Sequence, residues 1–250
     1  WYEILESVLT IYMGDLPKQV MFDNKVMSPM EFRDKMEINT ADYVELTSYS
    51  HHPWYSKFNL EIPDNWSFDL YYNLPIDELM EVMNSALKNG YTICWDGDVS
   101  DKHFSHSQGS ATVPDDNSEN TEKEITQKMR QETFLSGQAT DDHLMHITGM
   151  AEGNNNTIYY KTKNSWGTKG NEFGGYLYMS ESFVKLNTIA FMIHNIYTRR
   201  NTCHIRHHSR CCHRNSRTKG FMMVRSKLPM FVSDFCCNDM IFDTLLVCPC

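Results

Sequence analysis

Three features are scarce in this sequence, and each scarcity excludes a class of protein. No apolar run reaches the roughly 18 to 20 residues that a membrane-spanning helix needs, so we expect no membrane span. Basic residues are outnumbered, with 23 Lys and Arg against 32 Asp and Glu, for a formal net charge of −9. That balance argues against a general nucleic-acid-binding protein. Basic residues are also missing at the start of the chain, where a signal peptide would need them.

The first residues indicate a helix. Glu3 and Glu6 stand where a signal peptide carries Lys or Arg, and the chain does not begin with methionine. Leu5, Val8 and Leu9 recur on one side of a helical repeat, which predicts an amphipathic helix. A protein seldom begins inside a helix, so we expect the natural N-terminus to lie upstream.

Composition changes sharply at residue 196. Residues 196–250 carry nine Lys and Arg against three Asp and Glu, seven of the eight cysteines and a single glycine. The preceding 195 residues carry 14 basic and 29 acidic side chains. One folded unit rarely changes composition so abruptly. We therefore expect part of a helical insertion in residues 1–40, a folded domain in 41–195 and an irregular or out-of-frame tail in 196–250.

Hydrophobic periodicity and turn residues predict a mixture of helices and strands. The Ser28-Pro29 pair, followed by Glu31, fits the start of a capped helix, and Asp23-Asn24 fits the turn of a short hairpin. The expected helices cover residues 1–12, 30–36, 75–89 and 121–133. The expected strands cover residues 43–47, 59–62, 91–95, 144–150, 157–163, 176–180 and 188–194.

The central feature is a β-hairpin within Asp141–Gly167. Two strand-like runs flank residues 152–156, a dense cluster of turn residues. If the turn is centred between Gly153 and Asn154, the simplest antiparallel register sets His143 opposite Asn164. An asparagine carbonyl can hold one ring nitrogen of a neutral histidine without adding charge, which leaves the other nitrogen as a base.

These residues carry a resemblance. Asp142-His143 and the stretch 163–167, KNSWG, resemble the His and Asn blocks of papain-like cysteine peptidases. Three further stretches narrow the match: 42–53, with YVELTS and HHP; 91–100, YTICWDGDVS; and 129–134, MRQETF. Together they resemble the bleomycin hydrolase or aminopeptidase C family in its Bacteroides-like bacterial form, over roughly residues 1–195.

The resemblance implies a fold and an activity. The expected fold is α+β: the C-terminal, antiparallel β-barrel-like half of a papain-like fold, with part of a helical insertion. By position, His143 is the general base, Asn164 orients it, Trp166 shields their hydrogen bond and Asp142 supports the site. The family is expected to remove N-terminal residues from peptides through a Cys-His-Asn site without a cofactor. It also implies a homo-oligomer, a hexamer in the family, and a cytoplasmic location.

The nucleophile is missing from this pattern. In the family it opens a long helix after a Gln and a Gly-rich turn, whereas Cys94 ends a strand and precedes Asp96-Gly97-Asp98. We therefore interpret Cys94 as a buried structural cysteine. The chain is expected to contribute only the histidine and asparagine, and to show no peptidase activity alone.

Two further histidine groups suggest metal binding but lack a suitable pattern. Adjacent residues on an extended chain point to opposite faces, which predicts that one ion does not take both His51 and His52. His103 and His106 have no ligand partners at suitable spacing and are interpreted as solvated.

The tail carries zinc-type side chains without zinc-type spacing. Its candidates are Cys203, His204, His207, His208, Cys211, Cys212 and His213. Two alternatives to a peptidase fragment therefore stay open. One is a zinc-binding module acting through this tail. The other is a non-catalytic peptide-binding module that uses the aromatic loops at Trp54 and Trp66.

Overall fold

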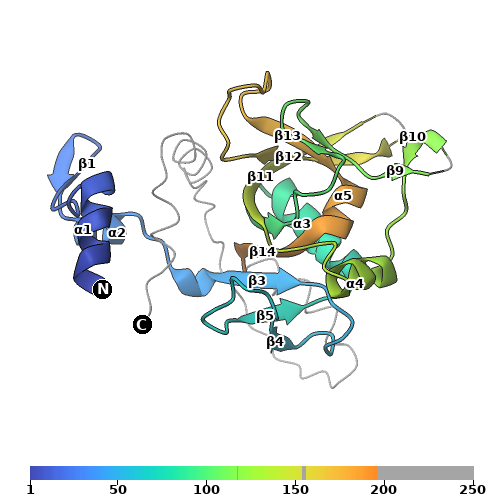
Figure 1. Ribbon diagram of the computed structural model, residues 1–250, viewed down its shortest axis with the longest axis horizontal. Coiled ribbons are helices and arrows are strands. Elements are labelled where there is room, and N and C mark those ends of the chain that lie inside the picture. The colour runs from blue at the N-terminus through green and yellow to red at the C-terminus, as the bar shows by residue number, and fades with distance from the viewer. Residues whose placement is uncertain (117, 154–155, 196–250) are drawn as a thin grey trace, which may run out of the picture. The chain divides into compact units, whose positions relative to one another are not determined.

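The computed structural model describes residues 1–116, 118–153 and 156–195, which form two compact units (Figure 1). The first unit is Trp1–Ala41, and the second begins at Asp42. Each is described by itself. The tail, including the zinc-type residues from Cys203 to His213, lies outside the described residues.

The first unit consists of two helices and a hairpin, and its turns follow from the local sequence. Helix α1 spans Tyr2–Met13, strands β1 (Val20–Phe22) and β2 (Lys25–Met27) form a hairpin, and helix α2 spans Pro29–Lys35. Asp23 and Asn24 take φ angles of 52° and 57°, the left-handed conformation that a tight two-residue hairpin turn needs. The predicted turn is therefore confirmed.

The start of α2 also follows its sequence. The Ser28 hydroxyl accepts a hydrogen bond from the Glu31 backbone N–H at 3.2 Å, and the Ser28 N–H donates to the Glu31 carboxylate at 2.8 Å. This reciprocal pair satisfies two N–H groups that the first turn of a helix leaves free. The predicted capping box is confirmed.

The second unit is organised on one ten-stranded sheet. The strand order is β4-β5-β3-β14-β6-β11-β12-β13-β8-β7. The pairs β3–β5 and β13–β8 are parallel and the others antiparallel. The strands are β3 (Tyr43–Thr47), β4 (Lys57–Asn59), β5 (Leu70–Asn73), β6 (Ile93–Gly97), β7 (Phe104–Ser105), β8 (Ser110–Ala111), β11 (His143–Glu152), β12 (Ile158–Lys163), β13 (Tyr176–Ser180) and β14 (Thr188–His194).

The sheet is open, with β4 and β7 at its edges among the described residues. The expected α+β class is confirmed, and among the described residues the sheet of the expected barrel-like half is open and includes two parallel pairs. A separate short pair, β9 (Pro114–Asp115) and β10 (Ser118–Glu122), lies outside the sheet.

Two helices pack against the middle of the sheet. Helix α3 (Ile76–Lys88) contacts β6 and β11, and α5 (Glu181–Asn187) contacts β12, β13 and β14 (Figure 1). The helix predicted over residues 75–89 buries its apolar side chains in the main core, which also includes Trp95 and Phe191. Met80 and Met83 of this helix are core residues. This packing fixes β6 and β11, the strands that lead into the histidine site.

Helix α4 (Gln127–Leu135) is joined to the sheet by buried polar side chains. The guanidinium of Arg130, 1% exposed, donates to the backbone carbonyls of Ser48, Lys185 and Ile189 at 2.8, 3.1 and 3.3 Å. Because these carbonyls lie at separate points of the chain, one side chain ties α4 to the end of β3 and to the α5–β14 connection.

Some element boundaries differ from the sequence prediction. The helix expected over 121–133 begins only at Gln127, because Ser118–Glu122 forms β10. The strand expected over 59–62 is β4, which ends at Asn59 and leaves Glu61 in a loop. Strand β5 and helix α5, together with the 3-10 turn Thr40–Asp42, were not predicted. Among the described residues, no helix has both the length and the apolar character to cross a membrane.

Candidate active site

The hairpin exists, but its register differs from the simplest prediction. His146 pairs with Lys163 and Glu152 with Ile158, and the register shifts between Ile147 and Gly149. The turn is longer than assumed, since the Gly153 N–H donates to the Thr157 carbonyl at 2.8 Å. The centre of the turn therefore lies beyond Gly153–Asn154. As a result, His143 and Asn164 are diagonal neighbours rather than directly opposed.

The two side chains nevertheless meet. His143 Nε2 lies 2.9 Å from Asn164 Oδ1. His143 opens β11, and Asn164 follows the last residue of β12, so both stand at the same open end of the hairpin. Diagonal neighbours in a ladder remain within reach of polar side chains. With the carbonyl oxygen as acceptor, Nε2 carries the proton and Nδ1 is the nitrogen that can accept one.

A second histidine holds the other side of the asparagine amide. Asn164 Nδ2 lies 3.3 Å from His106 Nδ1, and Asn164 itself is 1% exposed. His106 Nε2 is buried without a hydrogen-bond partner in the described part of the chain. The prediction that His106 is solvated is therefore wrong. Sequence reasoning missed its role because β7 and β8, which flank it, are only two residues each.

The loop after Asn164 is fixed by Asn171. Its Nδ2 donates to the carbonyls of His106 and Tyr176 at 2.6 and 3.0 Å, and its Oδ1 accepts from the N–H groups of Phe173 and Gly175. This second buried asparagine was also missed. Gly175 has φ +78°, and a Cβ there would lie 2.8 Å from the Gly167 carbonyl oxygen. Asn171 and Gly175 thus fix the conformation of the loop that follows the Asn164-Ser165-Trp166-Gly167 sequence.

The predicted supporting residues take different positions. The Trp166 ring lies beside the site, with its centroid 4.9 Å from that of His143. Asp142 turns away, and its Oδ1 accepts from the Val99 N–H at 3.0 Å. Burial raises the pKa of Asp142. Its contribution is to join the start of β11 to the end of β6, since no hydrogen bond to His143 is present among the described residues.

Cys94 is not beside the base. It pairs with His146, whereas His143 pairs with Gly97, three positions further along the ladder. At about 3.3 Å per residue, three positions separate the two backbones by about 10 Å. The Cys94 side chain is exposed, so its interpretation as a buried cysteine is wrong. The reason is strand alternation: Ile93 and Trp95 face the core, and Cys94 faces the other side.

A carboxyl pair lies behind the hairpin entrance. Burial raises the pKa of Asp96 to about 9, and its hydrogen bond to Asp141 acts in the same direction. Burial also raises the pKa of Asp141, against the lowering effect of the Asp96 hydrogen bond. Two neighbouring carboxylates resist double ionisation, so the pair shares a proton that resides on Asp96.

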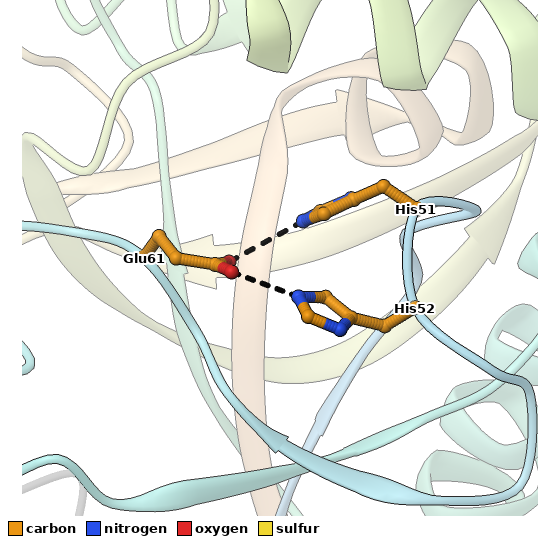
Figure 2. Close-up of side chains that lie close together, drawn as sticks. All are labelled: His51, His52 and Glu61. Atoms are coloured by element: carbon orange, nitrogen blue, oxygen red, sulfur yellow. Dashed lines mark hydrogen bonds and ion pairs between the residues drawn. The ribbon is translucent and has the colours of Figure 1, made fainter.

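The adjacent histidines also differ from expectation. His51 and His52 both turn toward Glu61, and their three ligand-type atoms lie within 4.8 Å of one another (Figure 2). The expectation of opposite directions fails because residues 50–52 form a turn rather than an extended strand. His103 forms a pair with Asp101, with Nδ1 and Oδ1 3.2 Å apart. Of the described residues, the His51–His52–Glu61 group alone combines three metal-ligating side chains in this way.

Comparisons with known proteins found two curated relatives and a solved structure of similar fold. Aminopeptidase G of Lactobacillus delbrueckii subsp. lactis is 24% identical over 177 residues, which cover 69% of this chain and 40% of the relative. Aminopeptidase E of Lactobacillus helveticus is 26% identical over 168 residues, covering 64% and 37%. The crystal structure of PepW from Lactobacillus rhamnosis HN001 superposes with a TM-score of 0.61 at 22% identity, over 78% of this chain and 47% of PepW.

Two conclusions follow. The chain spans less than half the length of these relatives, and the likeness to PepW shows the fold. The sequence profile of the Peptidase C1-like family matches residues 14–208, which is most of the chain. The chain therefore belongs to the Peptidase C1-like family.

Proposed function

We propose that this chain supplies the histidine and asparagine of a cysteine-type aminopeptidase site. The observation that carries the proposal is the 2.9 Å contact between His143 Nε2 and Asn164 Oδ1 beside the Trp166 ring. It supports the role of Nδ1 as the base, because the other nitrogen is held in its protonated form. The names of the curated relatives, Aminopeptidase G and Aminopeptidase E, support the same reaction class.

The proposed chemistry needs a thiol next to Nδ1. His143 would take the proton of that thiol, the thiolate would attack the peptide carbonyl, and the resulting imidazolium would protonate the leaving amine. Water would then hydrolyse the acyl-enzyme. Asn164 would keep the imidazole in one tautomer and orientation throughout. Cys94 is the one cysteine among the described residues, and it stands away from His143. We therefore expect the chain alone to be inactive.

The finer assignment belongs to the same proposal. The motif set supports the bleomycin hydrolase or aminopeptidase C branch, with peptides as substrates and a cytoplasmic, homo-oligomeric protein, a hexamer in the family. Sedimentation of the purified chain tests the assembly. A single species of six chains would support it, and a stable monomer would contradict it.

A chimera tests the catalytic role. Residues 42–195 would replace the equivalent segment of Aminopeptidase G, so that the relative supplies its own remaining residues. We expect release of N-terminal residues from aminoacyl fluorogenic substrates. His143→Ala should reduce kcat by about 1,000-fold or more, because it removes the base of an acyl transfer.

The control is His103→Ala in the same chimera. His103 is a half-buried histidine paired with Asp101, and its loss should leave kcat unchanged. A chimera whose activity survives His143→Ala would contradict the proposal. Activity of the unaltered chain that His143→Ala abolishes would contradict only the expected inactivity of the chain alone, because the chain would then hold its own nucleophile.

A further inference from the structure

The strongest unassigned group in the second unit is the cluster of His51, His52 and Glu61. His52 Nε2 lies 2.8 Å from Glu61 Oε1, and His51 Nε2 lies 3.3 Å from Glu61 Oε2 (Figure 2). The histidines occupy the turn that follows β3, and Glu61 comes just after β4. Two imidazoles and one carboxylate from different loops thus converge on one point.

We propose that His51, His52 and Glu61 bind one divalent transition-metal ion of the zinc class, through both Nε2 atoms and the Glu61 carboxylate. Imidazole nitrogen and carboxylate oxygen are ligands that Zn²⁺ takes at about 2.0 to 2.2 Å. Tetrahedral bonds of that length separate neighbouring ligand atoms by about 3.3 Å. The two nitrogen–oxygen distances already fall near this separation, so small side-chain rotations admit the ion.

Aromatic contacts hold both histidine rings in place, which favours metal binding. The His52 ring stacks on buried Phe58, with centroids 4.0 Å apart and planes at 21°. The His51 ring lies against Tyr49 and Phe134, with centroid distances of 5.9 and 6.0 Å. These contacts restrict both imidazoles, which lowers the entropic cost of gathering the ligands.

The fourth coordination position faces solvent. The side chains of the two histidines are each 28% exposed, and that of Glu61 is 55% exposed. An ion can therefore enter without unfolding of the loop, and water can complete a tetrahedral shell. Three protein ligands with an open fourth position form the arrangement of an exchangeable site rather than a closed structural one.

Gln131 sets the affinity of the site. Its Oε1 accepts from the Ser50 N–H at 2.6 Å, which identifies its Nε2 as the atom 3.0 Å from His51 Nδ1. This amide donates to Nδ1 and so keeps the His51 proton on Nε2. Binding of an ion through Nε2 moves that proton to Nδ1 and turns the amide away. Gln131 thus weakens the site, whereas a carboxylate there would accept from both N–H groups.

Titration of the full chain with Zn²⁺ and Co²⁺ tests the site. The variants are His52→Ala and the isosteric Glu61→Gln, with His103→Ala as the matched control because His103 also pairs with a carboxylate. The Co²⁺ absorption spectrum distinguishes this site from a site formed by the cysteines after residue 195. Thiolate ligands give Co²⁺ an intense charge-transfer band, whereas imidazole and carboxylate ligands give none. Circular dichroism verifies that each variant folds.

We expect the unaltered chain and His103→Ala to bind one ion without thiolate character. His52→Ala and Glu61→Gln should weaken that binding at least about tenfold, since each lacks one of three ligands. Equal binding by all four proteins would overturn the proposal, as would cobalt spectra that show thiolate ligation alone.

Gln131→Glu provides the opposite test. A carboxylate that accepts from the Ser50 N–H and from protonated Nδ1 of His51 should tighten zinc binding about tenfold. This gain requires ligation through His51 Nε2. Unchanged or weaker binding by a folded Gln131→Glu protein would therefore overturn the assignment of His51 as a ligand.

Discussion

The second unit contains two histidine sites that differ in the partner of the imidazole. At the hairpin, His143 meets the neutral amide of Asn164, and at the loop, His51 and His52 meet the carboxylate of Glu61. An amide fixes a tautomer without adding charge, which suits a base that must gain and lose a proton. A carboxylate shared by two imidazoles adds the negative charge that attracts a cation. The chemistry of each site thus follows from the oxygen that faces the ring.

The two sites also rest on different supports. Asn164 and His143 extend from adjacent strands of the sheet, so the backbone ladder brings them together. The loop site depends on side chains of α4: Gln131 holds the Ser50 N–H, and Arg130 holds the Ser48 carbonyl. The hairpin site should therefore tolerate changes in α4 that the loop site does not.

The largest expected effect comes from removing the α4 anchor. Arg130→Met removes three hydrogen bonds of a buried guanidinium. Gln127 and Thr47 still donate to the carbonyls of Ser48 and Ile189, at 3.3 and 2.7 Å. The Lys185 carbonyl has no other side-chain donor among the described residues, and a buried unsatisfied group costs about 1 to 3 kcal/mol. We expect the free energy of unfolding to fall by roughly 3 kcal/mol, measured by urea denaturation. Arg33→Met is the control, because Arg33 is 63% exposed and should change stability by less than about 0.5 kcal/mol. Equal effects of the two substitutions would show that Arg130 is not the anchor.

The next largest effect tests the amide oxygen of Asn164 as the partner of His143. Asn164→Ala removes the acceptor that keeps the proton of His143 on Nε2, and we expect kcat of the Aminopeptidase G chimera to fall about 100-fold. In the unaltered full chain, the ¹⁵N shifts of His143 should report one dominant tautomer, and in the variant a mixture. A variant with the same shifts and the same kcat would show that Asn164 does not orient the base.

Prediction from sequence succeeded where chemistry depends on short, regular spacing. The hairpin, its turn residues and the meeting of His143 with Asn164 follow from strand patterning. The register did not, because the turn spans Gly153–Thr157 and β11 carries an irregularity between Ile147 and Gly149. The contact survived because diagonal neighbours are still within reach.

Prediction failed for the directions of three side chains, those of His51, His52 and Cys94. His51 and His52 were expected to diverge, as they would on a strand, but a turn points them at the same carboxylate. Cys94 was expected to be buried, although alternation from the buried Trp95 could have placed it on the other face. The first error came from assuming an extended backbone, and the second from treating a cysteine on a strand as buried without counting the alternation.

Asp96 and Asp141 form a carboxyl pair, a third polar group that contains no imidazole. The unfolded chain releases the Asp96 proton near pH 4, whereas the folded chain keeps it to about pH 9. Between those values the folded state binds more protons, so stability falls as the pH rises. Asp96→Asn should remove this slope, so the variant should gain stability relative to the unaltered chain as the pH rises from 5 to 9. Asp116→Asn is the control, since Asp116 is 84% exposed. A slope that persists in Asp96→Asn would assign it to other groups.

The smallest effect concerns the histidine behind the asparagine. His106 Nδ1 faces Asn164 Nδ2 at 3.3 Å and so keeps the amide oxygen directed at His143. We expect His106→Ala to let the amide rotate, mix the tautomers of His143 and lower kcat of the chimera about tenfold. His106→Asn should restore both readouts, because its side-chain oxygen can stand near the former Nδ1 and accept from the same amide. Equal losses in both variants would mean that the His106 ring only fills space beside Trp166. Rescue by asparagine would show that the amide partner of the base needs a partner of its own.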